Sequence, residues 1–215
     1  YGITLSRNQY EQCLRQIDEE GLQGRVSVEL KDYRDMTGDA VFDKIVSVGM
    51  FEHVGIGNFP LYFGTARRLL KPGGLLLNHG ITCDTEGWRK SLSTEFINRY
   101  VFPDGELDTV SNVQCAMEHS GFDILDVEAL RPHYAMTLRH RVQRLENHRN
   151  EALQCISEPT YRIWRLYMAA CALAFEEGGI GIYQILAARR AKGLSPVPLT
   201  RRDVYGQPVK PEGDE

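Results

Sequence analysis

Two acid–base side chains, Glu52 and His53, follow the end of a short apolar segment of the chain after three intervening residues. That segment, "FDKIVSV" (residues 42–48), is typical of a core strand. A second histidine, His79, stands near the end of another apolar segment, "GLLLNHGIT" (residues 74–82). A carboxylate and an imidazole at strand ends could transfer protons or hold a small polar molecule inside an apolar pocket.

Each of these residues also has a structural interpretation. Glu52 could be a carboxylate favoured by the dipole at a helix N-terminus, and spacing alone leaves this alternative as strong as a catalytic role. A histidine such as His53, in a strand-end loop, is more often structural or a cofactor contact than a general base. For His79 the residues alone favour a core histidine that is hydrogen-bonded to backbone.

The elements that must position these side chains alternate along the chain. Strands are predicted at residues 1–6, 25–30, 42–49, 74–82, 122–130 and 179–190, and helices at 7–20, 58–70, 110–120, 133–155 and 158–177, with an irregular stretch at 83–107. This order predicts βαβ units and a mostly parallel sheet. Ligands bind beyond the carboxyl ends of such strands, so Glu52 and His79 should face one crevice. The two long helices are expected to cap it.

Length and composition narrow the class of protein. The 215 residues can form one domain with a substantial core, and their apolar (42%) and charged (25%) fractions are ordinary for a globular protein. A net charge of −4 gives no electrostatic reason to expect nucleic acid. Five cysteines without a CxxC pair argue against a disulfide framework and a zinc site, so no metal is predicted and a reducing cytoplasm is expected. The longest apolar stretch is too short to span a bilayer.

Residues 1–190 are expected to form the domain, and residues 191–215, rich in proline, glycine and charge, an extended tail. The chain begins at Tyr1 and reads as part of something longer.

Two pairs of residues near the start of the chain allow alternatives. Ser6 and Gln9 have the spacing of a helix capping box, although Gln9 could instead contact a ribose. Tyr33 and Arg34 could lie in a solvated loop, or the aromatic ring could stack on a base in a nucleotide-binding crevice.

The first long helix carries a cluster of basic residues. The cluster could be a solvated face or could bind an anionic membrane surface. Its members are Arg139, His140, Arg141, Arg144, His148 and Arg149.

Six blocks of sequence, taken together, resemble one family. They are "GITLSRNQ", "DYRD", "FDKIVSVGMFEHVG", "RLLKPGGLLLNHGIT", "FINRYVFPDGEL" and "RIWRLYMAACALAF". From Tyr1 to about Arg190 the chain is similar to the cyclopropane-fatty-acyl-phospholipid synthases, S-adenosylmethionine-dependent enzymes that include mycolic acid cyclopropane synthases and fatty-acyl C-methyltransferases. The resemblance implies an α/β class I methyltransferase (Rossmann-like) fold: a mostly parallel sheet with an antiparallel last strand and a helical cap. It also implies that the first strand and glycine loop are absent from this chain.

The resemblance assigns roles to eleven residues. Thr4, Leu5 and Gln9 correspond to the family's segment beside the cofactor ribose. Tyr33 and Arg34 correspond to the pair near the adenine, and Val48 and Gly49 to the strand end under S-adenosylmethionine. With Gln9 at the ribose, Ser6 would cap the helix alone. The family's bicarbonate site, in which the isoleucine contributes backbone, corresponds to Glu52, His79, Ile81 and Tyr134.

The implied reaction is methyl(ene) transfer to the double bond of an unsaturated fatty-acyl chain of a phospholipid, with bicarbonate as the base that closes a cyclopropane. This chain has Gly80 where the family has threonine, which keeps a methyl- or methylene-branching enzyme as an alternative. The missing glycine loop keeps an inactive fragment or lipid-binding module as another. The expected partners are phospholipid acyl chains at a membrane surface, with a homodimer as an open alternative and no nucleic acid. The expected location is the cytoplasm, peripheral to the inner membrane surface.

Overall fold

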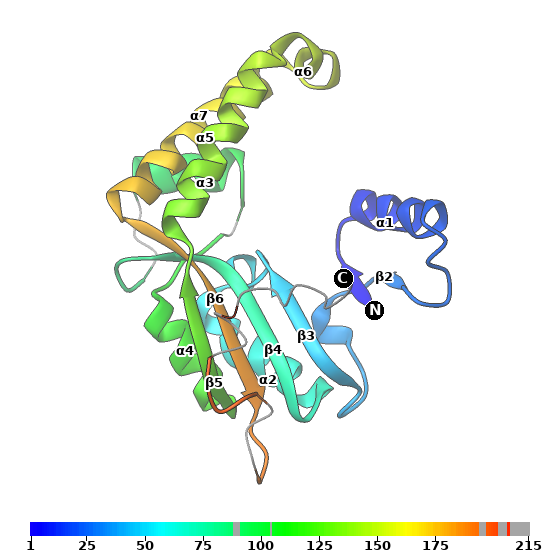
Figure 1. Ribbon diagram of the computed structural model, residues 1–215. Helices are drawn as coiled ribbons and strands as arrows, with labels where there is room; N and C mark the ends of the chain where they lie inside the picture. Colours follow the sequence, from blue (N-terminus) through cyan, green and yellow to red (C-terminus); the bar gives the residue numbers. More distant parts are fainter. Residues whose placement is uncertain (88–90, 104, 194–196, 202–205, 207–215) are drawn as a thin grey trace, which may run out of the picture.

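The computed structural model describes residues 1–87, 91–103, 105–193, 197–201 and 206 (Figure 1). The strands are β1 (Gly2–Thr4), β2 (Val28–Leu30), β3 (Phe42–Val48), β4 (Leu70–Cys83), β5 (Phe122–Ala129) and β6 (Ile180–Arg189). The α-helices are α1 (Arg7–Glu19), α2 (Phe59–Leu69), α3 (Leu92–Tyr100), α4 (Val110–His119), α5 (Arg131–Asn147), α6 (Arg149–Cys155) and α7 (Glu158–Glu177). Short 3-10 turns are η1 (Tyr33–Asp35), η2 (Phe51–His53) and η3 (Ile56–Asn58). The predicted extended tail lies largely outside the described residues.

The strands form two sheets. One has the order β3-β4-β6-β5, in which β6 runs antiparallel to both of its neighbours and β3 is parallel to β4. The other is the parallel pair of β1 and β2. The predicted mostly parallel arrangement with an antiparallel last strand is therefore confirmed. The register pairs Val48 with His79, so the two predicted strand ends lie side by side.

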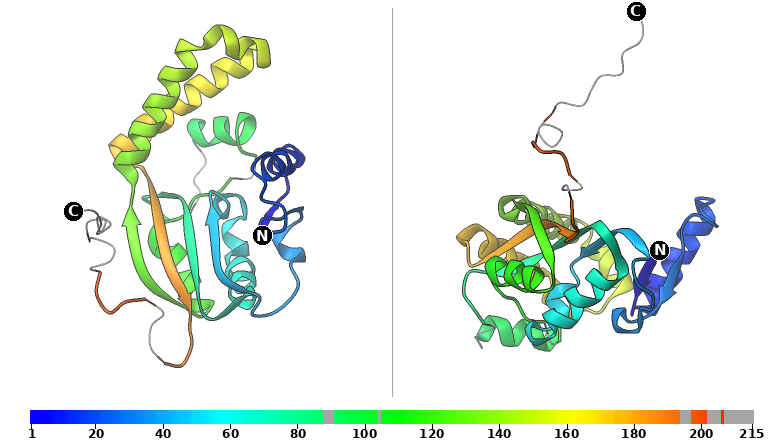
Figure 2. Two further views of the ribbon diagram at one scale, coloured as in Figure 1. Left: turned by 45° about the vertical axis from the view of Figure 1, so that its right-hand side comes forward. Right: turned by 90° about the horizontal axis from the view of Figure 1, so that it is seen from below.

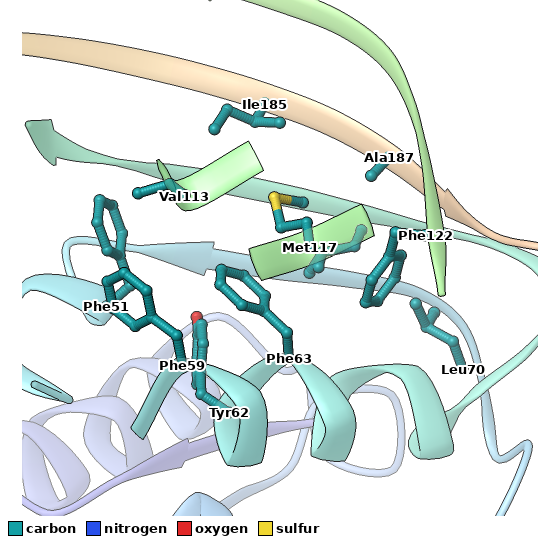
Figure 3. Close-up of a cluster of buried hydrophobic side chains, with 11 residues drawn as sticks. Phe51, Phe59, Tyr62, Phe63, Leu70, Val113, Met117, Phe122, Ile185 and Ala187 are labelled. Atoms are coloured by element: carbon teal, nitrogen blue, oxygen red, sulfur yellow. The ribbon is translucent and has the colours of Figure 1, made fainter. Parts of the chain in front are cut away.

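Helices α2 and α4 cover one face of the larger sheet (Figures 1 and 2). The main core lies between that face and the two helices, where Phe63, Val113 and Met117 are completely buried (Figure 3). Helices α5 and α7 pack against each other and project as an arm from the carboxyl ends of the parallel strands (Figure 1). The core thus fixes the strands, and the arm rises above the strand ends as the predicted cap.

One helix was missing from the sequence prediction. Residues 83–107 were expected to be irregular but contain α3. The Ser91 side chain accepts a hydrogen bond from the Thr94 N–H, and the Thr94 hydroxyl accepts one from the Ser91 N–H. This is a capping box with threonine in place of the usual Glu or Gln, and so the sequence signature is weak.

Three predicted boundaries were also wrong. The strand expected at 74–82 begins at Leu70, because Leu70 already pairs with Phe42 of β3. The helix expected at 133–155 is interrupted at His148, whose backbone (φ −107°, ψ 29°) leaves the helical region between α5 and α6. The strand expected from residue 25 begins only at Val28, because the N–H groups of Arg25 and Val26 bond to the Leu22 carbonyl in a turn.

The two sheets present unpaired edges. Among the described residues, β1 pairs only with β2 and β3 pairs only with β4. The face of β3 opposite the main core is also open, since Val46 and Val48 are each 64% exposed. Apolar residues on both faces are typical of a parallel strand that is covered on both sides. None of the described helices has the length and apolar character needed to cross a membrane.

Candidate active site

A cavity of about 900 Å³ lies beyond the carboxyl ends of β3 and β4, beneath the α5–α7 arm. Its wall is mostly apolar and aromatic and includes Phe96, Phe102, Leu138, Tyr167 and Phe175. The volume lies at the upper end of the range of about 300–1,000 Å³ that is usual for small-molecule sites. The cavity occupies the position that the topology of a parallel sheet predicts for a ligand.

Glu52 is buried in this wall, with 6% of its surface exposed. Its Oε1 atom accepts a hydrogen bond from the Ile81 N–H at 2.8 Å. Its Oε2 atom is buried and has no hydrogen-bond partner among the described residues. Burial raises the pKa of this carboxyl, while the Ile81 N–H opposes the rise. Glu52 therefore has one oxygen fixed by a hydrogen bond and one without a partner among the described residues, and it can retain a proton at higher pH than an exposed glutamate.

His79 extends from β4 into the same cavity. Within the described chain its Nδ1 atom is buried without a hydrogen-bond partner, and no hydrogen bond joins it to Glu52. Burial lowers its pKa, so the ring is more readily neutral than an exposed histidine. Among the described residues no backbone group forms a hydrogen bond with the His79 ring, so the alternative of a core histidine bonded to backbone is not supported.

Ile81 and Tyr134 complete the predicted catalytic group, and both line the cavity with Glu52 and His79. The Ile81 N–H is already used by Glu52. Tyr134, at the start of α5, packs edge-on against Phe175 with ring centroids 5.0 Å apart. Four residues from β4, η2 and α5 are thus brought to one cavity, as their expected shared role requires.

Gly80 makes room for this arrangement. A Cβ atom at this position would lie 2.1 Å from Phe51 Cε1 and 2.8 Å from Glu52 Oε1. Real Cβ atoms essentially never approach other atoms so closely. The absence of a side chain at Gly80 therefore allows Phe51 and Glu52 to pack directly against β4.

Two of the predicted cofactor residues, Val48 and Gly49, also line the cavity. Gly49 has φ of 62°, a left-handed conformation that glycine adopts without a steric penalty. Its N–H donates to the His79 carbonyl at 2.9 Å. This bond joins the turn after β3 to β4 at the floor of the cavity.

The remaining predicted cofactor residues lie outside the cavity, on the segment from β1 to η1. The Thr4 hydroxyl donates to Gln9 Oε1 at 2.7 Å, and Leu5 is 72% exposed. The Ser6 side chain accepts the Gln9 N–H, while the Gln9 side chain does not reach back to the cap. Ser6 therefore caps α1 without the second half of a capping box, as was expected if Gln9 has another role.

Tyr33 and Arg34 lie in η1. The Tyr33 ring packs edge-on against Tyr62 at 5.5 Å, and the Arg34 guanidinium pairs with Asp32. Arg34 is 63% exposed in its side chain, which leaves it accessible from solvent. The described residues do not bring this pair to the cavity.

Sequence reasoning missed a cluster of aromatic rings at the wall of the cavity. Phe102 lies between the His53 ring at 5.1 Å and the Tyr167 ring at 5.7 Å, and Trp164 packs on Tyr167. Burial lowers the pKa of His53, which fits a structural ring contact rather than a charged group. The spacing of Phe96 and Tyr100 in "LSTEFINRY" is the signal that could have indicated an apolar helix face here.

An α/β sheet of this strand order, with one antiparallel strand and a cavity at the carboxyl strand ends, defines a class I methyltransferase fold. The cyclopropane synthase MmaA2 from Mycobacterium tuberculosis matches with a TM-score of 0.79 at 31% identity, over 87% of this chain and 68% of that one. The mycolic acid cyclopropane synthase CmaA1, complexed with SAH and CTAB, matches with a TM-score of 0.77 at 30% identity, over the same shares. The predicted fold class is confirmed.

Residues 1–185 match the family described as mycolic acid cyclopropane synthetase, and the chain belongs to that family. It is 46% identical to a probable fatty acid methyltransferase of Pseudomonas putida, over 95% of this chain and 53% of the relative. It is 39% identical to the probable fatty acid methyltransferase Rv3720 of Mycobacterium tuberculosis, over 92% of this chain and 46% of that protein. The chain therefore spans about half the length of these curated relatives, and the predicted family is confirmed.

Proposed function

We propose that the whole protein is an S-adenosylmethionine-dependent methyltransferase that acts on the double bond of an unsaturated fatty-acyl chain. The finer proposal is that the acyl chain belongs to a phospholipid and that the product is a cyclopropane. One observation carries the proposal: Glu52 and His79 line a large, mostly apolar cavity, and each has a buried polar atom without a hydrogen-bond partner among the described residues. Such a cavity suits a hydrocarbon chain, and the two polar atoms suit a small reactive group beside it.

The family gives this proposal its reaction class. Relatives with 46% and 39% identity are named as probable fatty acid methyltransferases, and CmaA1 was solved with SAH and CTAB. S-adenosylmethionine supplies an electrophilic methyl group, and bicarbonate, when bound, supplies a base. The chain's own task is to hold the alkene in line with that methyl group and away from water.

The residues present fit a bicarbonate ion. Glu52 Oε2 and His79 Nδ1 are the buried, unpartnered atoms that such an ion could satisfy, and Tyr134 lines the same space. Burial raises the pKa of Glu52, so a protonated carboxyl that can donate to an anionic oxygen forms more readily here than at an exposed glutamate. Glu52, His79 and Tyr134 would therefore hold the base beside the acyl chain. The rings of Phe102 and Tyr167 would face the positive charge that develops on that chain.

The cofactor would lie between the two sheets. We propose that in the whole protein a strand from outside residues 1–215 pairs between the open edges of β1 and β3 and carries a glycine-rich loop. Backbone N–H groups of such a loop can approach a ligand closely. Val48 and Gly49 would then lie under the cofactor. The adenosine would be held by residues on the segment from β1 to η1, of which Leu5, Gln9 and Arg34 are exposed and Thr4 and Tyr33 are half-buried.

A membrane surface is the proposed source of the acyl chain. Leu92 and Leu166 line the cavity and are 88% and 58% exposed, so its rim is apolar toward solvent. Such a rim can contact the hydrocarbon region of a bilayer, which would let a phospholipid chain enter without crossing water. The protein would then be cytoplasmic and peripheral to the inner membrane surface.

The experiment is a product analysis of the whole protein incubated with S-adenosylmethionine and vesicles of a mono-unsaturated phospholipid. The proposal expects acyl chains heavier by one CH₂ unit that resist catalytic hydrogenation under mild conditions. Chains with the same added mass that take up hydrogen would indicate a methylene branch instead. Unaltered acyl chains, with the cofactor bound, would contradict the proposed activity.

Formation of a methylene branch, in which the proton is lost from the new methyl group and a double bond forms to it, is the second candidate. Two observations favour it: the most similar of the relatives named above are described as fatty acid methyltransferases, and Gly80 changes the packing beside Glu52. Fragmentation of the product by mass spectrometry distinguishes the outcomes, because a ring and a methylene branch have equal mass.

A further inference from the structure

Arg141 is a single cationic side chain at the mouth of the cavity beneath the α5–α7 arm, in which the acyl chain is proposed to bind (the acyl cavity). Among the described residues that line the cavity, it is the only arginine or lysine. It is exposed to solvent, so it marks the rim and not the floor. Its guanidinium carbon lies 5.8 Å from the centroid of the Tyr134 ring. This contact orients the planar group above a residue of the proposed bicarbonate site.

The charge of Arg141 is not used within the described fold. Three other arginines of the arm have carboxylate partners: Arg139 pairs with Glu176, Arg149 with Glu158 and Arg165 with Glu146. No ion pair involves Arg141 in the part of the chain that the structure describes. Carboxylates of the arm thus pair with Arg139, Arg149 and Arg165, whereas Arg141, at the cavity entrance, has no such partner among the described residues.

The acidic side chains that line the cavity do not neutralise the charge of Arg141. Asp84 also lines the cavity but forms no ion pair with Arg141. Glu52 is buried, its Oε1 atom is bonded to the Ile81 N–H, and among the described residues it forms no ion pair with Arg141. An anionic ligand group at the mouth would thus meet one arginine, with no carboxylate bound to it.

We propose that Arg141 binds an anionic oxygen group at the polar end of the acyl substrate, either a phosphate ester or a carboxylate. The inference rests on the proposed function, because it assumes that the cavity holds an acyl chain. A guanidinium presents paired N–H donors that match the oxygens of phosphate and carboxylate. With the anionic head at Arg141 and the reacting carbons beside Glu52 and His79, the depth of the cavity would select which double bond reacts.

The test measures binding of three ligands to the full chain below their aggregation limits: oleate, oleoyl lysophosphatidate and methyl oleate. They share one hydrocarbon chain and carry a carboxylate, a phosphate and a neutral ester. We expect Arg141→Gln to weaken the anionic ligands about tenfold and to leave methyl oleate unchanged. The matched control is Arg144→Gln, since Arg144 lies on the same helix, is exposed and does not line the cavity.

The ligands also separate the two sources of the anion. Loss of affinity for the lysophosphatidate alone would assign the site to a phosphate, and loss for oleate alone to a carboxylate. Equal weakening of all three ligands by Arg141→Gln would overturn the proposal, because the arginine would then act only by packing on Tyr134. So would equal effects of Arg141→Gln and Arg144→Gln. Failure of the unaltered chain to bind any of the three would overturn the acyl cavity itself, and the role of Arg141 with it.

Discussion

At the scale of single residues, Glu52 combines a buried carboxyl with one bound and one free oxygen. Its pKa is raised in the folded chain, chiefly by burial, so the folded state favours the protonated form. The resulting contribution to stability is fully present below the unfolded value of 4.5 and is lost as pH rises through the folded pKa. Burial of the charged carboxylate therefore lowers the free energy of unfolding at pH values above the folded pKa.

This cost predicts the effect of Glu52→Gln on stability. Glutamine keeps an oxygen that can accept the Ile81 N–H and carries no charge to bury. We expect the variant to have a higher melting temperature than the parent chain at pH 8, and the difference to shrink as pH falls through the folded pKa of Glu52 and to vanish below the unfolded value. Thermal unfolding followed by circular dichroism across this pH range measures it. A difference that is constant with pH would show that Glu52 is not titrating as described.

Gly80 gives a second prediction at this scale. Gly80→Ala would place a methyl group within 2.1 Å of Phe51 and 2.8 Å of Glu52. Overpacking of this kind costs about 1–3 kcal/mol of unfolding free energy, and here it should also displace the carboxylate and lower turnover. Gly64→Ala, in α2 with no atom within 4 Å of the added carbon, should instead stabilise the chain by about 0.5–1 kcal/mol. Chemical denaturation of both variants tests the contrast, and equal stabilities would contradict it.

At the scale of elements, the strands were predictable where an apolar run met a clear turn residue. The run at 42–48 ends at Gly49, and β3 has those bounds. The common position of Glu52 and His79 beside one cavity was also predictable, since the ends of parallel strands share an edge of the sheet. Helix α3 was not predictable from its capping box, because Thr94 stands where that motif usually has Glu or Gln. The cluster of aromatic rings at the cavity wall was missed for a related reason: Phe102 and Tyr167 meet only through tertiary packing.

The cap of α3 predicts a local effect. Ser91→Ala removes the acceptor for the Thr94 N–H and should cost about 1 kcal/mol in that helix. Because α3 contains no buried residue, we expect faster amide exchange in α3 with little change in global stability. Thr109→Ala, which uncaps α4 beside the buried Val113 and Met117, should lower global stability instead. Hydrogen exchange with mass spectrometry measures both, and a global loss from Ser91→Ala would contradict this account.

At the scale of the whole molecule, the open edges of β1 and β3 and the exposed Val46 and Val48 define where the proposed cofactor strand would pair. We expect residues 1–215 alone to bind S-adenosylmethionine weakly or not at all, because the segment from β1 to η1 would supply the proposed adenosine contacts but none of the N–H groups of a glycine loop. Isothermal titration of this chain and of the whole protein makes the comparison. Micromolar affinity for residues 1–215 alone would show that another segment replaces the loop.

The central claim is that Glu52 serves the chemistry at the acyl cavity and not the binding of the cofactor. The most direct measurement compares Glu52→Gln with the parent in the whole protein, recording both methyl-transfer turnover and the dissociation constant for S-adenosylmethionine. The account predicts that turnover falls about a hundredfold or more while cofactor affinity is unchanged. Unchanged turnover, or a loss explained by weaker cofactor binding, would contradict it.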